Sequence, residues 1–254
     1  MDHFYISLIS FLVLIVGIHI GRNIPGLFPK ADVDIETKEA IKRGLAFLTT
    51  LTALVLGLLV STGKASFDKQ SEAVAEMISE AATLDEMLSH YGADADQALK
   101  SFRIGANTVL LSLWDKSYAE QQQQFEKAKR KTNEDFLDLV ANLPKDTEQH
   151  QFFKEKAGSS ATSLIKARYK LATLQHSVIP IPMLVTIVLW LTCIFMSLGF
   201  CSPKNMTALI SEYVGALCAA AAILLITELD NPFTGVIQIS KEPAAMALRA
   251  IGAP

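Results

Sequence analysis

The chain has 254 residues, of which 50% are apolar and 19% are charged, and its mean hydropathy is positive. This composition indicates that the chain divides into membrane-embedded and water-exposed parts. The net charge of −3 excludes the concentrated basic surface that binds nucleic acid, so no nucleic-acid partner is expected.

The first apolar run covers residues 4–21. A cleaved signal peptide is the competing interpretation, but residues 1–3 lack Lys and Arg, and no small-residue cleavage site follows the run. We therefore predict a retained transmembrane helix. His19 lies near its end, where a histidine at headgroup depth is expected to be solvated.

A polar connection over residues 22–43 carries two prolines and an acidic patch formed by Asp32, Asp34 and Glu36. Calcium binds clusters of carboxylates, but this patch lacks the ligand spacing of an EF-hand loop, so no metal site is predicted. Residues 34–43 are expected to begin a helix that leads into the membrane.

The stretch that organises the chain covers residues 44–91. Residues 44–63 are apolar and long enough to cross a bilayer, which takes roughly 20 residues in a helix. After Gly63 no turn signal follows, because residues 64–91 contain neither proline nor glycine and are rich in good helix formers. We predict one helix that leaves the membrane and continues into water. Its seam, spaced alternately three and four residues apart, is predicted to be Val74, Met77, Ala81, Leu84, Leu88 and Tyr91.

A soluble helical bundle is predicted over residues 64–179. Asp94 is the predicted N-cap of a second helix after the break at Gly92. Pro144 closes this region, and a further helix is predicted from about residue 148 to 176. The second helix is expected to bury a stripe of Leu99, Phe102, Ala106, Val109 and Leu113. The further helix is expected to bury Phe153, Ala157, Ala161, Leu164 and Leu171.

Two more apolar runs cover residues 183–201 and 206–227 and predict a second transmembrane hairpin. Glu212 lies inside the last run. An intramembrane carboxylate is a functional candidate, but a position at headgroup depth is the favoured interpretation here. The three cysteines are interpreted as small buried hydrophobic residues, because their spacing fits neither a zinc site nor a disulfide framework. They are Cys193, Cys201 and Cys218.

Together these segments predict an all-α fold, in which a four-span integral membrane protein carries a helical bundle between spans two and three. The predicted domains are a first transmembrane hairpin (1–63), the bundle (64–179), a second transmembrane hairpin (180–228) and a C-terminal tail (229–254). Four spans place both termini and the bundle on one side of the membrane. The Lys and Arg residues that flank the spans are evenly divided between the two sides, so they do not fix the orientation.

Neither enzymatic activity nor a cofactor is expected. The bundle has no metal-ligating residues clustered at ligand spacing and no glycine-rich phosphate-binding loop. Its histidines, His90, His150 and His176, are far apart in the sequence, so each is interpreted as a solvated or packed residue.

The order of two spans, a helical insert, two spans and a tail resembles the bestrophin channels, and resembles more closely a bacterial family called bestrophin-like. Residues 53–70, ALVLGLLVSTGKASFDKQ, resemble that family's second span, and residues 229–240, LDNPFTGVIQIS, resemble its C-terminal signature. Phe67-Asp68-Lys69 is similar to the Tyr-Asp-Arg that follows the second span of bestrophins. The signature residues are Asn231, Pro232, Phe233 and Gly235. The segment Asn231-Pro232-Phe233 is similar to the Asn-Pro-Phe-Gly motif of bestrophins.

The resemblance implies a homo-oligomeric channel for small ions, with five copies favoured, in a bacterial inner membrane. It also implies that the bundle and both termini face the cytoplasm, which suits a bundle without disulfides. Bestrophins that bind calcium follow Asn-Pro-Phe-Gly with a run of acids, whereas Val236-Ile237-Gln238-Ile239 follows here, so no calcium clasp is expected.

The same resemblance places Ala53, Gly57 and Ser61 where bestrophins carry the bulky apolar neck of the pore. Thr50 and Lys64 extend this face at either end. One interpretation is a pore lining with a wide neck. The other is close helix packing, because residues spaced four apart form the small-xxx-small pattern of membrane helices. For the whole protein a channel is the leading hypothesis, and the alternative is a membrane-anchored scaffold or sensor whose bundle binds a partner.

Overall fold

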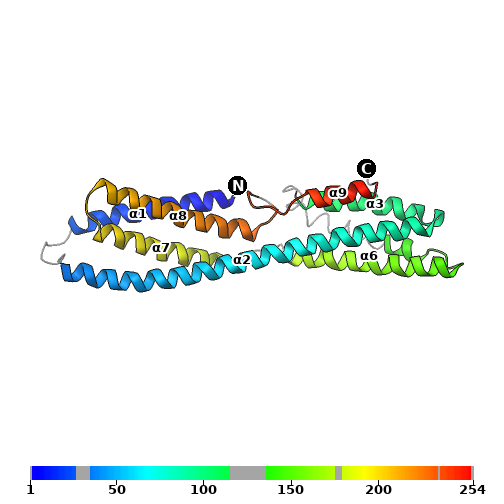
Figure 1. Cartoon of the computed structure of the whole chain (residues 1–254), viewed down its shortest axis with the longest axis horizontal. Coiled ribbons are helices and arrows are strands. Elements are labelled where there is room, and N and C mark those ends of the chain that lie inside the picture. Colours follow the sequence, from blue (N-terminus) through cyan, green and yellow to red (C-terminus); the bar gives the residue numbers. More distant parts are fainter. Residues whose placement is uncertain (1, 27–34, 115–135, 175–178, 234, 253–254) are drawn as a thin grey trace. The chain divides into compact units, whose positions relative to one another are not determined.

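A computed structural model describes residues 2–26, 35–114, 136–174, 179–233 and 235–252, and contains helices and no strand in these ranges (Figure 1). The chain separates into two compact units. The membrane unit comprises Met1–Phe67, Ser177–Asn231 and Gly235–Ile237, and the bundle unit comprises Asp68–His176, Pro232–Thr234 and Gln238–Pro254.

Four helices are long and apolar enough to cross a membrane, so the protein is an integral membrane protein with the predicted all-α, four-span fold. They are α1 (Asp2–Asn23), α2 (Ile35–Tyr91), α7 (Ile181–Cys201) and α8 (Met206–Asp230). Each helix begins either before the apolar run that predicted it or at the first residue of that run. Polar residues, and the prolines at the start of α7, are accommodated in a first helical turn.

Helix α2 confirms that one helix runs on beyond the membrane span, since its 57 residues form a single uninterrupted ribbon (Figure 1). It begins at Ile35, inside the segment 34–43 that was predicted to begin a helix leading into the membrane. Gly63 does not end it. A Cβ at Gly63 would lie 3.3 Å from Leu229 Cβ of α8, so this glycine serves a close helix approach instead of a turn.

The membrane unit is held together mainly by α1, which packs against α7 and α8. A Cβ at Gly21 would overlap the Met196 carbonyl group, and one at Gly199 would lie 2.5 Å from the Ile18 carbonyl oxygen. Small residues are what lets two membrane helices approach this closely. Gly17 and Gly21 therefore form the small-xxx-small contact of α1 with α7.

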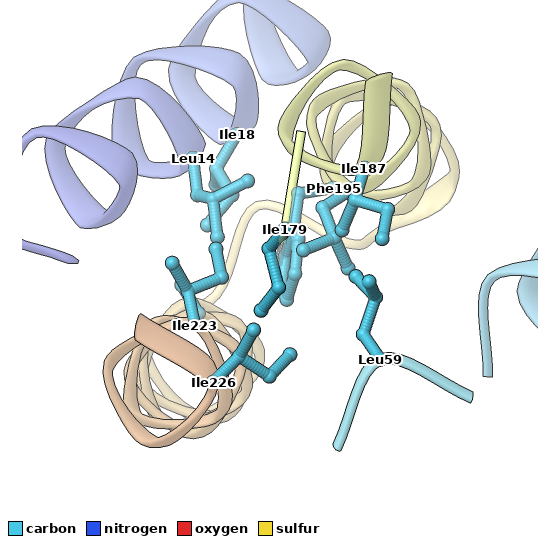
Figure 2. Close-up of a cluster of buried hydrophobic side chains, with 10 residues drawn as sticks. Leu14, Ile18, Leu59, Ile179, Ile187, Phe195, Ile223 and Ile226 are labelled. Carbon is cyan, nitrogen blue, oxygen red and sulfur yellow. The ribbon is translucent and has the colours of Figure 1, made fainter. Parts of the chain in front are cut away.

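Apolar side chains from all four spans meet in one buried cluster (Figure 2). Leu14 and Ile18 of α1 face Ile223 and Ile226 of α8, and Leu59 is the fully buried contribution of α2. Because lipid tails are as apolar as these side chains, the cluster stabilises the unit through close packing more than through exclusion of water.

In the bundle unit, every residue of the predicted α2 seam is buried. The Glu76–Lys170 ion pair and the stacking of Tyr91 on His150 join α2 to α6 (Glu148–Leu174), and α9 (Glu242–Ala250) packs against α3 (Asp96–Ser112). The guanidinium of Arg103 in α3 donates two hydrogen bonds, of 2.7 and 3.0 Å, to the Asp85 carboxylate in α2. The predicted α6 stripe is mostly confirmed, with Ala157, Ala161 and Leu171 buried and Phe153 and Leu164 half-buried.

Two sequence predictions in α3 need correction. Its buried positions are Ala98, Phe102, Ala106 and Leu110, whereas the predicted Leu99, Val109 and Leu113 are half-buried. The predicted cap is also wrong, because Ala95 is the N-cap and no side chain caps the helix. Gly92, with φ +106°, leads instead into a single 3-10 turn, Ala93–Ala95, and Asp94 lies inside that turn.

Candidate functional site

The five residues predicted to line a pore are all exposed in the chain: Thr50, Ala53, Gly57, Ser61 and Lys64. We call them the α2 stripe. The residues through which α2 contacts its own chain, Thr52, Leu59 and Gly63, are buried. At about 100° of rotation per residue, the two sets lie on opposite sides of the helix. In the part of the chain that the structure describes, the α2 stripe therefore lies on an exposed side of the helix.

Close packing within the chain does not use this stripe. A Cβ at Gly57 would meet nothing within 4 Å, in contrast to Gly21 of α1. The small-xxx-small pattern occurs in both helices, but only α1 uses it to approach another helix of the same chain. Another copy, lipid or the contents of a pore can contact the exposed residues Ala53, Gly57 and Ser61 of the stripe.

The α2 stripe is also chemically distinct from the surface beside it. The Thr50 hydroxyl donates a 2.9 Å hydrogen bond to the Ala46 carbonyl of its own helix, so it needs no other partner in a dry environment. The Lys64 ammonium lies 5.3 Å from the centroid of the Phe67 ring, within cation–π range, at the C-terminal end of the stripe.

Bulky apolar side chains stand next to the stripe on the same helix. Phe47, Leu54 and Leu58 are each more than half exposed. Only 11% of the membrane-spanning part of α2 is buried inside the chain, compared with 28 to 33% for the other three spans. Among the spans, α2 therefore presents the largest share of its surface outward, divided into a small, weakly polar part and a bulky apolar part.

The C-terminal signature is folded onto Trp114 within the bundle unit. Pro232 is buried, and Phe233 meets the Trp114 ring edge to face with centroids 5.9 Å apart. The Trp114 indole N–H donates to the Ile239 carbonyl at 2.9 Å, and the Ile239 N–H donates to the Pro232 carbonyl at 2.8 Å. Sequence reasoning did not single out Trp114, although a tryptophan beside a polar segment was a signal for a buried anchor.

Within the membrane unit, the signature is bound by Glu228 of α8. One carboxylate oxygen of Glu228 accepts hydrogen bonds from the backbone N–H groups of Val236 (2.6 Å) and Ile237 (3.2 Å). Gly235 precedes them with φ +111°, a conformation that favours glycine. Asn231 follows α8 directly and is its C-cap. Sequence reasoning missed Glu228, whose position at the very end of the last apolar run was the available signal.

The candidate carboxylate Glu212 is paired inside the membrane unit. Its side chain is 8% exposed and lies 3.0 Å from the Arg22 guanidinium, which is 11% exposed. Arg22 also donates to the carbonyls of Pro203 (2.9 Å) and Asn205 (3.3 Å) in the turn between α7 and α8. Glu212 thus takes part in a contact that fixes the end of α1 to this turn.

The histidines differ in their exposure and in the side chains that they contact. His19 is exposed, as predicted, and its Nε2 lies 2.8 Å from the Tyr213 hydroxyl. His150 stacks on Tyr91 with ring centroids 4.6 Å apart, and the His90 ring stacks on Phe153 at 5.7 Å. These two contacts place the end of α2 beside the start of α6. His176 lies outside the described residues.

The phenol of Tyr91 is buried in this aromatic group and donates to the Pro144 carbonyl. Burial, together with the negative charges of Asp94 and Asp146, raises the pKa of Tyr91 above its ordinary value of 10.0. The described residues contain no group of three or more side chains able to hold a metal ion. Asp32 and Asp34 of the acidic patch lie outside the described ranges.

The cysteines are less buried than predicted. Cys193 and Cys201 are half-buried, and Cys218 is exposed, because it lies on the side of α8 that faces away from the other spans. None of the three is in a disulfide.

The family model described as "Bestrophin-like domain" matches residues 11–244. The chain has no significant match among curated proteins or among solved structures.

Proposed function

This chain belongs to the bestrophin-like family, and we propose that it is a homo-oligomeric membrane channel through which small ions pass along the α2 stripe. The observation that supports the proposal most is the exposure of all five stripe residues on the side of α2 opposite its own-chain contacts. A membrane span whose small, weakly polar face is uncovered needs a partner other than its own chain.

The bulky apolar part and the small, weakly polar part of the exposed α2 surface can contact different neighbours. The bulky part, with Leu54 and Leu58, can fill the space against lipid or the next copy. The small part leaves room beside it, and hydroxyls and a cation at its end offer a path that ions in water can follow. Several copies arranged with their stripes inward would form a pore with a wide neck, which is not closed by bulky apolar side chains.

We propose the assembly and orientation that the resemblance to bestrophins implies. We propose five copies as the favoured number, a bacterial inner membrane, and a cytoplasmic location for the bundle unit and both termini. We propose a transport role without catalysis, a cofactor or a bound metal.

A cysteine scan of α2 tests the lining. The native cysteines are replaced, and single cysteines are introduced at Gly57 and Ser61 on the stripe and at Leu54 and Leu58 beside it. In reconstituted liposomes, a small charged thiol reagent should modify the first pair and reduce ion flux, whereas the second pair should be modified slowly and without effect. Equal modification of both pairs would contradict a pore along the stripe.

The alternative is a membrane-anchored scaffold or sensor. Large apolar side chains on the bundle unit, Ile104 of α3 and Phe152 of α6, are more than half exposed and could meet a soluble partner. If the purified oligomer passes neither anions nor cations but binds a defined soluble protein through these side chains, this alternative replaces the channel.

A further inference from the structure

We infer that Glu228 is a positioning residue of the proposed channel: its carboxylate fills an anion-binding nest in the backbone of residues 235–237 and thereby fixes the end of α8 against α2, on the side of α2 opposite the α2 stripe. The inference rests on the proposed function for its effect on ion flux. The nest itself is defined by the contacts of Glu228 and is tested separately.

The nest consists of successive backbone N–H groups that point at one carboxylate oxygen. Glu228 Oε2 accepts from Val236 N (2.6 Å) and Ile237 N (3.2 Å), after a glycine with φ +111°. Successive N–H groups next to a residue with positive φ form a concave site for anions. The chain supplies the anion itself, from seven residues before the glycine.

The position of Glu228 is unfavourable for a carboxylate unless it has such a partner. Its side chain belongs to a residue that is only 5% exposed. It also lies in the last turn of α8, where the helix dipole is negative and disfavours a negative charge. Burial of a charge is costly without hydrogen bonds. The hydrogen bonds from the N–H groups of Val236 and Ile237 therefore explain how a carboxylate is stabilised at this place. A neutral side chain at the end of the span would not need such hydrogen bonds.

Because Gly235 has no side chain, it leaves room for the Glu228 carboxylate. A Cβ on Gly235 would lie 2.6 Å from the Glu228 carboxyl carbon and would overlap one of its oxygens. Gly92 provides a comparison, because its φ of +106° is nearly the same but a Cβ there would meet nothing within 4 Å. Alanine at Gly235 and at Gly92 would thus strain the backbone alike, and only the first would displace a carboxylate.

The link to the α2 stripe is the residue after Glu228. Leu229 is buried, and its Cβ lies 3.3 Å from the place where a Cβ of Gly63 would be. In the sequence, Gly63 lies between Ser61 and Lys64, the last two stripe residues, but it is on the opposite side of the helix. When Glu228 is held by the loop, the last turn of α8 is held where Leu229 contacts α2 at this end of the stripe.

The experiment uses the full-length oligomer in nanodiscs and liposomes, with amide hydrogen exchange, ion flux and oligomer mass measured on each variant. In Glu228→Ala, exchange at the amides of Val236 and Ile237 should become about tenfold faster, because hydrogen bonds to a charged group are lost. Flux should fall with the oligomer intact, and added formate should restore both properties by occupying the nest. Glu228→Gln, which keeps an acceptor oxygen, should lie between wild type and Glu228→Ala.

Glycine variants complete the test. Gly235→Ala should reproduce the faster exchange and lower flux without rescue by formate, whereas Gly92→Ala should leave both unchanged. In the Glu228→Ala background, Gly235→Ala should add little, since the displaced group is already absent. Unchanged exchange in Glu228→Ala, or faster exchange with wild-type flux, would overturn the inference. A wild-type oligomer that conducts no ions would instead refute the proposed function, and the exchange measurements would still decide whether the nest exists.

Discussion

The guanidinium of Arg22 lies 3.0 Å from the carboxylate of Glu212, although 190 residues separate the two in the chain. Both side chains are about nine-tenths buried, and Arg22 also donates to the carbonyls of Pro203 and Asn205. The second oxygen of Glu212 is buried and has no hydrogen-bond partner among the described residues. The contact fixes the end of α1 to the turn between α7 and α8, so its loss should affect the whole membrane unit.

We predict that Arg22→Met and Glu212→Met each lower the stability of the membrane unit by about 3 kcal/mol, because removal of one partner leaves a buried charge uncompensated. The double variant should be more stable than either single variant, since no charge is then left buried. Thermal unfolding in detergent measures all three. Lys170→Met is the control, because its ion pair with Glu76 is 49% and 44% exposed and should contribute at most about 1 kcal/mol. Additive losses in the double variant would contradict the paired arrangement.

Gly21→Ala should separate α1 from α7. Its Cβ would overlap the Met196 carbonyl group, and neither helix backbone can move without disturbing the buried cluster around Ile18. We expect a loss of several kcal/mol, on the order of an overpacked core. Gly44→Ala is the matched control, because a Cβ there would meet nothing within 4 Å. A thermal midpoint of Gly21→Ala equal to that of Gly44→Ala would show that the α1–α7 approach is looser than described.

Local patterns account for the parts of the fold that could be predicted from the sequence. The length of the apolar runs predicted the four spans, and the three-four spacing predicted six α2 residues that are all buried, because both are properties of a single helix. The α3 prediction was less accurate because Ala98 is a weak signal of burial, and its larger apolar neighbour Leu99 was predicted instead.

Contacts between distant segments could not be predicted in this way. The small-xxx-small pattern occurs in α1 and in α2, and only the packing of whole helices decides that Gly21 is covered while Gly57 is open. The partners of Glu212 and Glu228 depend in the same way on how α8 meets α1 and the signature loop. Glu212 could be identified from the sequence, whereas Glu228 was missed, and the groups that pair with either acid could not be predicted.

The stability of the bundle unit should fall at alkaline pH because of Tyr91. Its pKa is raised above 10.0 in the folded chain, mainly by burial. Below pH 10 the phenol is protonated in both the folded and the unfolded chain. Above it, the unfolded chain releases the proton first and is stabilised, so stability is lost as pH rises toward the folded pKa. Tyr91→Phe should remove this dependence. Unfolding midpoints measured between pH 9 and 11, a range around the ordinary tyrosine pKa of about 10, test this. Parallel curves for both proteins would contradict it.

The orientation can be tested with two single cysteines in a background without the native ones. Asp94→Cys lies in the bundle unit, and Lys204→Cys lies in the exposed turn between α7 and α8. With the bundle in the cytoplasm, an impermeant maleimide should label Lys204→Cys in intact cells and should label Asp94→Cys only after the cells are opened. The reverse pattern would place the bundle outside.

The most direct test of the channel is Gly57→Leu, with ion flux and oligomer mass measured on one preparation. A Cβ at this position meets nothing within 4 Å among the described residues, so we expect the effect of the leucine to arise in a pore, between copies or against lipid. Gly44→Leu, which also adds a leucine to open space but outside the stripe, is the control. If the α2 stripe lines a pore, Gly57→Leu should keep the oligomer and reduce flux by about tenfold or more, because a bulky apolar ring narrows and dries the neck. Dissociation of the oligomer would assign the stripe to packing between copies, and an intact oligomer with wild-type flux would contradict the pore.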